Sequence, residues 1–177
     1  YFIIKTTSIM EALMKRNLLR ILFLSLLITT FVVIFNFSSQ NGEESGSLSR
    51  AVTEKIVNTF PYIKDLSQET KAKMIEHGEI IVRKLAHLSI YTLVGIFIMA
   101  FMCTYNTKVL YKFGISLLVG LIYAITDEYH QSFVAGRGPS IRDVCIDTTG
   151  VFIGIIIVLI IVSVFKTLFM EKRQQKD

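Results

Sequence analysis

Residues 148–169 read TTGVFIGIIIVLIIVSVFKTLF, a stretch whose only charged residue, Lys166, stands near its end. About 20 apolar residues in a helix are enough to cross the roughly 30 Å hydrocarbon layer of a bilayer. Three more segments have a comparable length and apolar character, at residues 18–37, 85–104 and 109–126. The sequence therefore predicts an all-α, polytopic membrane helical bundle with four transmembrane helices.

The composition supports this class. Of the 177 residues, 52% are hydrophobic and 19% are charged, which is too apolar for a soluble domain of this size to bury in one core. Lys112 interrupts segment 109–126, and we expect its side chain to extend toward the lipid headgroups. The segment at 18–37 follows the basic pair Lys15-Arg16, as a secretory signal would. Its apolar stretch is longer than a signal core, so we interpret it as a retained anchor.

Positively charged residues gather on one side of the predicted bundle. If the four helices alternate in direction, three basic groups share a side: Lys15, Arg16 and Arg20; Lys108 and Lys112; and Lys166, Lys172, Arg173 and Lys176. Loops rich in lysine and arginine face the cytoplasm. We therefore expect a membrane domain at residues 17–169 between cytoplasmic segments at 1–16 and 170–177. The net charge of +5 arises partly from these flanks and gives no argument for a nucleic-acid partner.

Residues 38–83 then form an external segment between the first and second spans, with charges of both signs. Apolar residues recur there at every fourth position, after Ser45 and Ser47 and before Pro61: Leu48, Val52, Ile56 and Phe60. This spacing predicts an amphipathic helix that lies on the membrane or over the spans. A further helix is expected to begin near Ser67 and to continue into the second span.

Polar runs stand at the ends of the apolar segments, where a charge beside lipid is costly unless it has a partner or a function. Residues 84–87 read KLAH and residues 127–131 read DEYHQ. Spacings of three and four place the polar members of each run on one helix face: Lys84, His87 and Tyr91; Asp127, His130 and Gln131; and, after a loop at 135–139, Asp143 and Asp147. We expect the three groups to converge on the external side of the membrane.

The middles of the four spans carry almost no ionisable side chain. Transporters and channels usually keep polar groups or broken helices near the bilayer midplane. The distribution therefore argues against a translocation path and favours a site at the membrane surface.

These motifs resemble the VanZ-like membrane proteins over residues 18–160. The resemblance is carried by FSSQ at 37–40, KLAH at 84–87 with Tyr91, DEYHQSFVAGR at 127–137, Arg142-Asp143 and Gly150. It implies a multi-pass protein of the bacterial cytoplasmic membrane, in a family whose namesake is linked to teicoplanin resistance. It also implies a role in glycopeptide resistance or envelope modification. The family more often carries an amide where Asp147 stands.

The partners implied by this resemblance are a membrane lipid, a lipid-linked cell-wall precursor or a glycopeptide antibiotic. The sequence identifies no cofactor and no oligomeric state. Whether the protein is an enzyme stays open at this point.

The polar cluster has three possible interpretations. In the first, it is structural, since four cations face four carboxylates and can pair with them: Arg83, Lys84, Arg137 and Arg142 against Asp127, Glu128, Asp143 and Asp147. In the second, it is catalytic, with Asp127 or Glu128 as general acid or base, assisted by His130 and His87. Candidate substrate-binding residues are then Lys84, Gln131, Arg137, Asp143, Tyr91, Ser38 and Gln40.

The third interpretation is a metal site. His87, Asp127, Glu128 and His130 offer suitable nitrogen and oxygen ligands for a divalent ion. The paired-histidine spacing His-Glu-x-x-His is absent, and we assign no metal ligands from the sequence.

Overall fold

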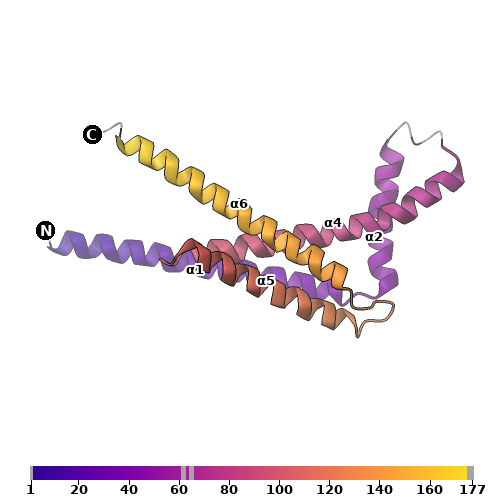
Figure 1. Ribbon diagram of the computed structural model, residues 1–177, viewed down its shortest axis with the longest axis horizontal. Coiled ribbons are helices and arrows are strands. Elements are labelled where there is room, and N and C mark those ends of the chain that lie inside the picture. The colour runs from indigo at the N-terminus through magenta and orange to yellow at the C-terminus, as the bar shows by residue number, and fades with distance from the viewer. Residues whose placement is uncertain (1, 61–62, 64–65, 175–177) are drawn as a thin grey trace.

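The computed structural model describes residues 2–60, 63 and 66–174, and every regular element in these ranges is an α-helix (Figure 1). The helices are α1 (Phe2–Ser38), α2 (Gly42–Thr59), α4 (Gln68–Cys103), α5 (Val109–Gln131) and α6 (Ile141–Gln174). Pro61, residue 1 of the predicted N-terminal segment, and residues 175–177 of the predicted tail, Lys176 among them, lie outside the described residues.

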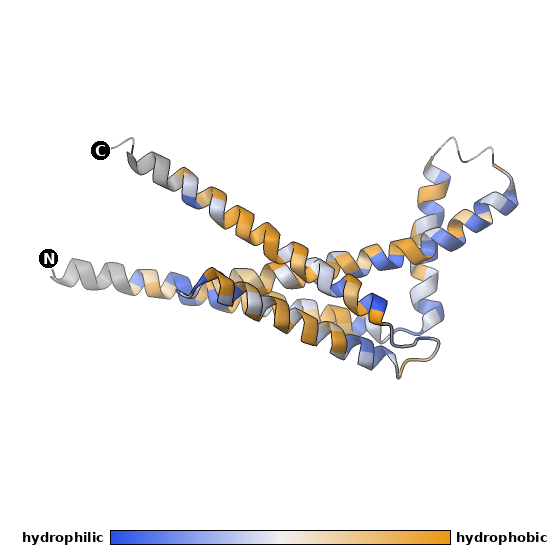
Figure 2. Cartoon of the chain, in the orientation of Figure 1, coloured by the Kyte–Doolittle hydropathy of each residue, from blue (hydrophilic) through white to orange (hydrophobic). Residues whose placement is uncertain are grey.

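Four of the helices are long and apolar enough to cross a membrane. The spans are Met10–Ser38, Gln68–Cys103, Val109–Gln131 and Ile141–Leu168. Apolar residues dominate these helices along most of their length (Figure 2). The predicted all-α bundle with four transmembrane helices is thereby confirmed.

The helices extend beyond the apolar segments at the end of the bundle where the polar runs lie. Helix α5 continues past residue 126 to Gln131, and α6 begins at Ile141 instead of residue 148. Asp127 and Asp147 are buried in these extensions. Because their side chains pack against neighbouring helices, the polar residues remain within the helices and do not form loops.

Helix α2 crosses α4 near the same end of the bundle (Figure 1). Its N-cap is Asn41, whose side chain accepts a hydrogen bond from the Glu44 amide, so the helix begins before Ser45 and Ser47. The face that packs on α4 is made of small residues and one valine: Gly46, Ser49, Thr53 and Val57. The residues of the predicted apolar stripe are exposed: Leu48, Val52, Ile56 and Phe60.

The most extensive helix contact joins α4 and α6. It is close because glycines lie on both sides: a methyl group at Gly95 would overlap the Val151 backbone, and one at Gly154 would overlap the Thr92 backbone. Small residues at such crossings let two backbones approach in lipid, where packing replaces the hydrophobic effect. Buried side chains on either side of the crossing form the core: Tyr91, Val94, Ile98 and Met99 of α4 with Val151 and Ile155 of α6.

At the opposite end of the bundle, Arg20 of α1 caps the C-terminus of α4. Its Nε donates to Thr104 Oγ1 at 3.1 Å, and its guanidinium lies 4.0 Å from the ring centre of Tyr105. This contact fixes α1 against α4 at the end farthest from the polar runs.

Gly154→Ala is expected to lower the free energy of unfolding by about 1–3 kcal/mol, the usual cost of overpacking. The added methyl group would meet the Thr92 carbonyl oxygen on α4. Gly114 of α5 is the matched control, because a methyl group there meets nothing within 4 Å, so Gly114→Ala should keep wild-type stability. Thermal unfolding of both variants in detergent micelles measures the difference. Equal stability of the two variants would contradict the tight contact between α4 and α6.

Candidate functional site

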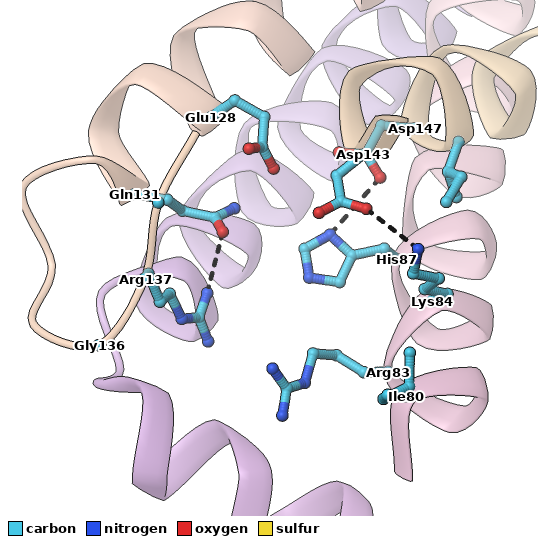
Figure 3. Close-up of a pocket in the computed structure, with 12 residues that line it drawn as sticks. Ile80, Arg83, Lys84, His87, Glu128, Gln131, Gly136, Arg137, Asp143 and Asp147 are labelled. Atoms are coloured by element: carbon cyan, nitrogen blue, oxygen red, sulfur yellow. Dashed lines mark hydrogen bonds and ion pairs between the residues drawn. The ribbon is translucent and has the colours of Figure 1, made fainter. Parts of the chain in front are cut away.

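A polar cavity of about 250 Å³ lies at the end of the bundle near the crossing of α2 and α4. Its walls come from α4, the end of α5, the following loop and the start of α6 (Figure 3). The ionisable residues that line it are Arg83, Lys84, His87, Glu128, Arg137, Asp143 and Asp147. The structure thus brings together residues from all three polar groups seen in the sequence.

Asp127 is held at this end of the bundle by neutral donors. Its Oδ2 accepts hydrogen bonds from Ser38 Oγ on α1 and from Gln131 Nε2 one turn later on α5, each at 3.0 Å. All three side chains are buried. These bonds orient the carboxylate without neutralising its charge.

Arg137 extends this network from the loop between α5 and α6. Its Nη1 donates to Gln131 Oε1 at 3.2 Å and to the Ser38 carbonyl oxygen at 3.5 Å. Its Nη2 donates to the Phe37 carbonyl oxygen at 3.4 Å. Each of these acceptors is neutral, so the charge of the guanidinium remains available to an anion.

The protonation of Arg137 follows from its surroundings. Burial lowers the pKa of the guanidinium, and the neighbouring Arg83 lowers it further, whereas Asp127 and Glu128 raise it. An arginine with a lowered pKa still remains protonated at neutral pH. The loop therefore supplies a permanent positive charge to the cavity.

Gly136 shapes the loop that carries Arg137. Its φ of +74° lies in the left-handed region that favours glycine. The amide of Gly42, at the start of α2, donates to the Ala135 carbonyl oxygen at 3.1 Å. A methyl group at Gly42 would overlap the carbonyl oxygen of Gly136. The loop is thus tied to the beginning of α2.

Glu128 and Asp143 line the cavity with partners of their own. Glu128 is 4% exposed, and its Oε2 accepts a hydrogen bond from the Ser140 amide at 2.8 Å. Its carboxylate points into the cavity (Figure 3). Asp143 Oδ1 lies 3.7 Å from Lys84 Nζ in a partly exposed ion pair. One acid is therefore shielded from water while the other is solvated and neutralised.

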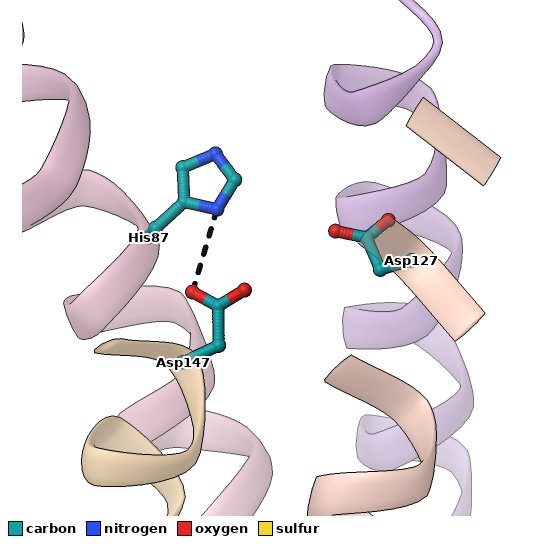
Figure 4. A group of neighbouring side chains, drawn as sticks. All are labelled: His87, Asp127 and Asp147. Carbon is teal, nitrogen blue, oxygen red and sulfur yellow. Dashed lines mark ion pairs between the residues drawn. The ribbon is translucent and has the colours of Figure 1, made fainter. Parts of the chain in front are cut away.

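His87 and Asp147 face each other across the contact between α4 and α6. The His87 Nδ1 lies 3.5 Å from Asp147 Oδ1. Asp147 is completely buried, and neither of its carboxylate oxygens has a hydrogen-bond partner within the described part of the chain. Asp127 lies beside this pair (Figure 4), and one ligand-type atom from each residue lies within 4.8 Å of the other two. These three residues could hold a metal ion.

An apolar cavity of about 270 Å³ adjoins the polar one. It lies between α1, α2 and α4, and most of its walls are hydrophobic side chains: Ile34, Phe37, Leu48, Val52, Val82 and Ile90. Arg83, His87 and Arg137 line both cavities. These three residues form the boundary between a charged chamber and an apolar one.

The remaining predicted site residues do not line the polar cavity. Ser38 and Gln40 line the apolar cavity. Tyr91 is fully buried in the core and lines neither cavity. His130 lies outside both cavities, with its Nε2 3.0 Å from Ser39 Oγ and its ring stacked on Phe35.

Some residues of the site did not stand out in the sequence. Arg83 was only one of several nearby cations, yet it lies on the boundary of the two cavities. Leu48 and Val52 were visible as members of an apolar stripe, but nothing in the spacing indicated that they form a cavity wall. The Ser140 amide, which binds Glu128, carries no sequence signal because it belongs to the backbone.

Arg137→Gln is expected to lower the free energy of unfolding by about 1–3 kcal/mol, since it leaves partly buried acceptors short of a donor. Arg50 of α2 is the matched control, because its ion pair with Glu54 is exposed. Arg50→Gln should change stability by at most about 0.5 kcal/mol. Chemical or thermal unfolding in detergent compares the two. An Arg137 variant as stable as the Arg50 variant would contradict the role of Arg137 in holding the loop against α1 and α5.

Comparison with known protein families identifies the family of the chain. The model of the VanZ/LLP1 family matches residues 23–163, which include every wall of both cavities. No curated protein and no solved structure matches the chain. Together with its four apolar spans, this match shows that the chain is an integral membrane protein that belongs to the VanZ/LLP1 family.

Proposed function

We propose that this protein binds an anionic lipid of the bacterial cell envelope and carries out acid–base chemistry on its headgroup. The lipid would be a membrane lipid or a lipid-linked cell-wall precursor. Through this action the protein would contribute to glycopeptide resistance, including teicoplanin resistance, or to envelope modification. A change in such a lipid alters the surface that a glycopeptide meets.

The observation that carries the proposal is the pair of joined cavities. An amphiphilic lipid needs an apolar chamber for its chain and a polar chamber for its headgroup, with cations where the two meet. Arg83, His87 and Arg137 occupy that boundary. Arg137 bonds only to neutral acceptors in its network, and a guanidinium matches the geometry of a phosphate oxygen pair.

Glu128 is the group best placed for proton transfer. Its carboxylate is shielded from water and points into the cavity, and the Ser140 amide holds one of its oxygens. A positioned carboxylate near a bound headgroup can donate or accept a proton. His87, at the boundary, is the second candidate for this role.

The proposed location is the bacterial cytoplasmic membrane with both termini in the cytoplasm. The basic flanks of the spans support this orientation through the positive-inside tendency. Arg20 lies at the end of the bundle opposite to the cavities. The cavities would therefore open near the outer surface, where envelope precursors and antibiotics are found.

Arg83→Gln is expected to weaken the binding of a polyprenyl phosphate at least about tenfold, because a charge-assisted bond to the phosphate is lost. Native mass spectrometry of the full-length protein in neutral-lipid nanodiscs measures this binding. Arg50→Gln is the control, since this substitution removes the same charge from an exposed position on α2 that lines neither cavity. The uncharged polyprenol should bind weakly to every variant. Equal binding of alcohol and phosphate would contradict the proposal.

Glu128→Gln separates chemistry from simple binding, because it keeps the size and the acceptor oxygen but removes the charge. We expect the variant to insert and to bind polyprenyl phosphate, while teicoplanin resistance in a susceptible host falls to the level of the empty vector. Retention of both binding and resistance would support the alternative function, a non-catalytic protein that shields an envelope component or sequesters the antibiotic. Loss of folding would assign Glu128 a structural role through Ser140.

A further inference from the structure

We infer that His87, Asp127 and Asp147 form a binding site for a single first-row divalent metal ion beside the polar cavity. This inference rests on the proposed function and deepens it, because the ion would lie where a lipid headgroup enters. The three residues come from three different helices, α4, α5 and α6.

The geometry of the group suits a metal ion. One ligand-type atom of each residue lies within 4.8 Å of the other two (Figure 4). Bonds of about 2.1 Å at tetrahedral angles place ligand atoms roughly 3.4 Å apart. Side-chain rotations that shorten these separations by at most about 1.4 Å would close the group around an ion.

Asp147 supplies an independent observation. It is completely buried, and within the described residues neither carboxylate oxygen has a hydrogen-bond partner. The His87 Nδ1 lies 3.5 Å from its Oδ1, and this nitrogen is also without a hydrogen-bond partner in the described chain. A buried carboxylate without a donor is costly unless an ion or a bound group completes it. The two atoms that face each other are both potential ligands.

Asp127 shows the arrangement expected of an oriented ligand. Ser38 and Gln131 both donate to its Oδ2. Hydrogen bonds of this kind around a metal ligand fix its orientation and raise its affinity for the ion. Residues from α1 and α5 thereby hold the carboxylate beside the His87–Asp147 pair.

The charge balance of the cavity points in the same direction. The walls of the polar cavity carry three carboxylates, Glu128, Asp143 and Asp147, and three cations, Arg83, Lys84 and Arg137, so these charges cancel. Asp127, which lies beside these walls, adds one negative charge where a headgroup would reach His87 and Asp147. One divalent ion reverses the sign and leaves open coordination positions for water or a phosphate oxygen.

The ligand types narrow the choice of ion. An imidazole nitrogen favours zinc, iron, cobalt or nickel over magnesium and calcium, while two carboxylates suit manganese and zinc. We therefore expect Zn²⁺ and Mn²⁺ to bind, and Ca²⁺ to bind poorly because the site has only three protein ligands.

The test uses the full-length protein, purified in detergent, stripped with a chelator and titrated with Zn²⁺ and with Mn²⁺ by calorimetry. We expect one ion per chain. His87→Gln and Asp147→Asn should each weaken binding more than about 100-fold, and Ser38→Ala, which removes only an orienting bond, about 10–100-fold. His77→Gln is the matched control, because His77 is an exposed imidazole on the same helix, and it should bind like the wild type.

Thermal unfolding separates loss of metal from loss of fold. Without metal, Asp147→Asn should unfold at the same temperature as the wild type or higher, since it removes a buried carboxylate charge that accepts no hydrogen bond from the described residues. Added Zn²⁺ should raise the unfolding temperature of the wild type and of the His77 variant but not that of the Asp147 variant. The absence of a bound ion, or equal affinity in the His87, Asp147 and His77 variants, would overturn the inference.

The lipid measurement in the same preparations keeps the two proposals distinct. Binding of polyprenyl phosphate to protein that takes up no ion would overturn the metal site and leave the lipid site standing. Uptake of one ion without lipid binding would support the metal site and overturn the proposed lipid site.

Discussion

The close approach of α4 and α6 is the constraint on which the site depends. Gly95, Gly150 and Gly154 remove the side chains that would otherwise keep the two backbones apart. His87 stands on α4 and Asp147 on α6, each within about two turns of these glycines, so the crossing itself brings imidazole and carboxylate to 3.5 Å. Lipid is itself apolar, so burying apolar side chains between two helices in a bilayer brings little hydrophobic stabilisation. Close approach of the backbones therefore depends on small residues and on polar bonds between helices. The contact thus both assembles the bundle and sets the geometry of the polar cavity.

The membrane class and the meeting of the polar groups were predictable because each depends on a short-range property. Apolar length decides whether a helix can span, and spacings of three and four decide which residues share a face. The prediction that Glu128 and His130 act together at one site did not take their directions on the helix into account. At 3.6 residues per turn, positions 128 and 130 point about 160° apart, so Glu128 and His130 cannot both face one cavity. The structure turns Glu128 inward and leaves His130 beside Ser39 and Phe35.

The orientation of α2 shows the limit of pattern analysis most clearly. The stripe of Leu48, Val52, Ile56 and Phe60 predicted an amphipathic helix on the membrane or over the spans, with the stripe as its apolar face. The helix instead buries Gly46, Ser49 and Thr53 against α4, because small side chains let it approach closely there. Hydrophobicity alone does not distinguish a face that meets protein from one that meets lipid. The apolar cavity lies between α1, α2 and α4. It depends on which face of α2 packs on α4, so it could not be predicted from any single segment.

Helix α1 is held by polar bonds at two points, from Arg20 to Thr104 and from Ser38 to Asp127, while much of the surface between these points is exposed. The distance from Arg20 to Ser38 is about 27 Å at the rise of an α-helix, close to the thickness of a hydrocarbon layer of roughly 30 Å. A thicker or thinner bilayer would strain this helix through hydrophobic mismatch, which it relieves by tilting. Tilt of α1 acts directly on the Ser38 bond that orients Asp127. The lipid composition of the membrane would therefore change the position of Asp127 through the tilt of α1, independently of any lipid that binds in the cavities.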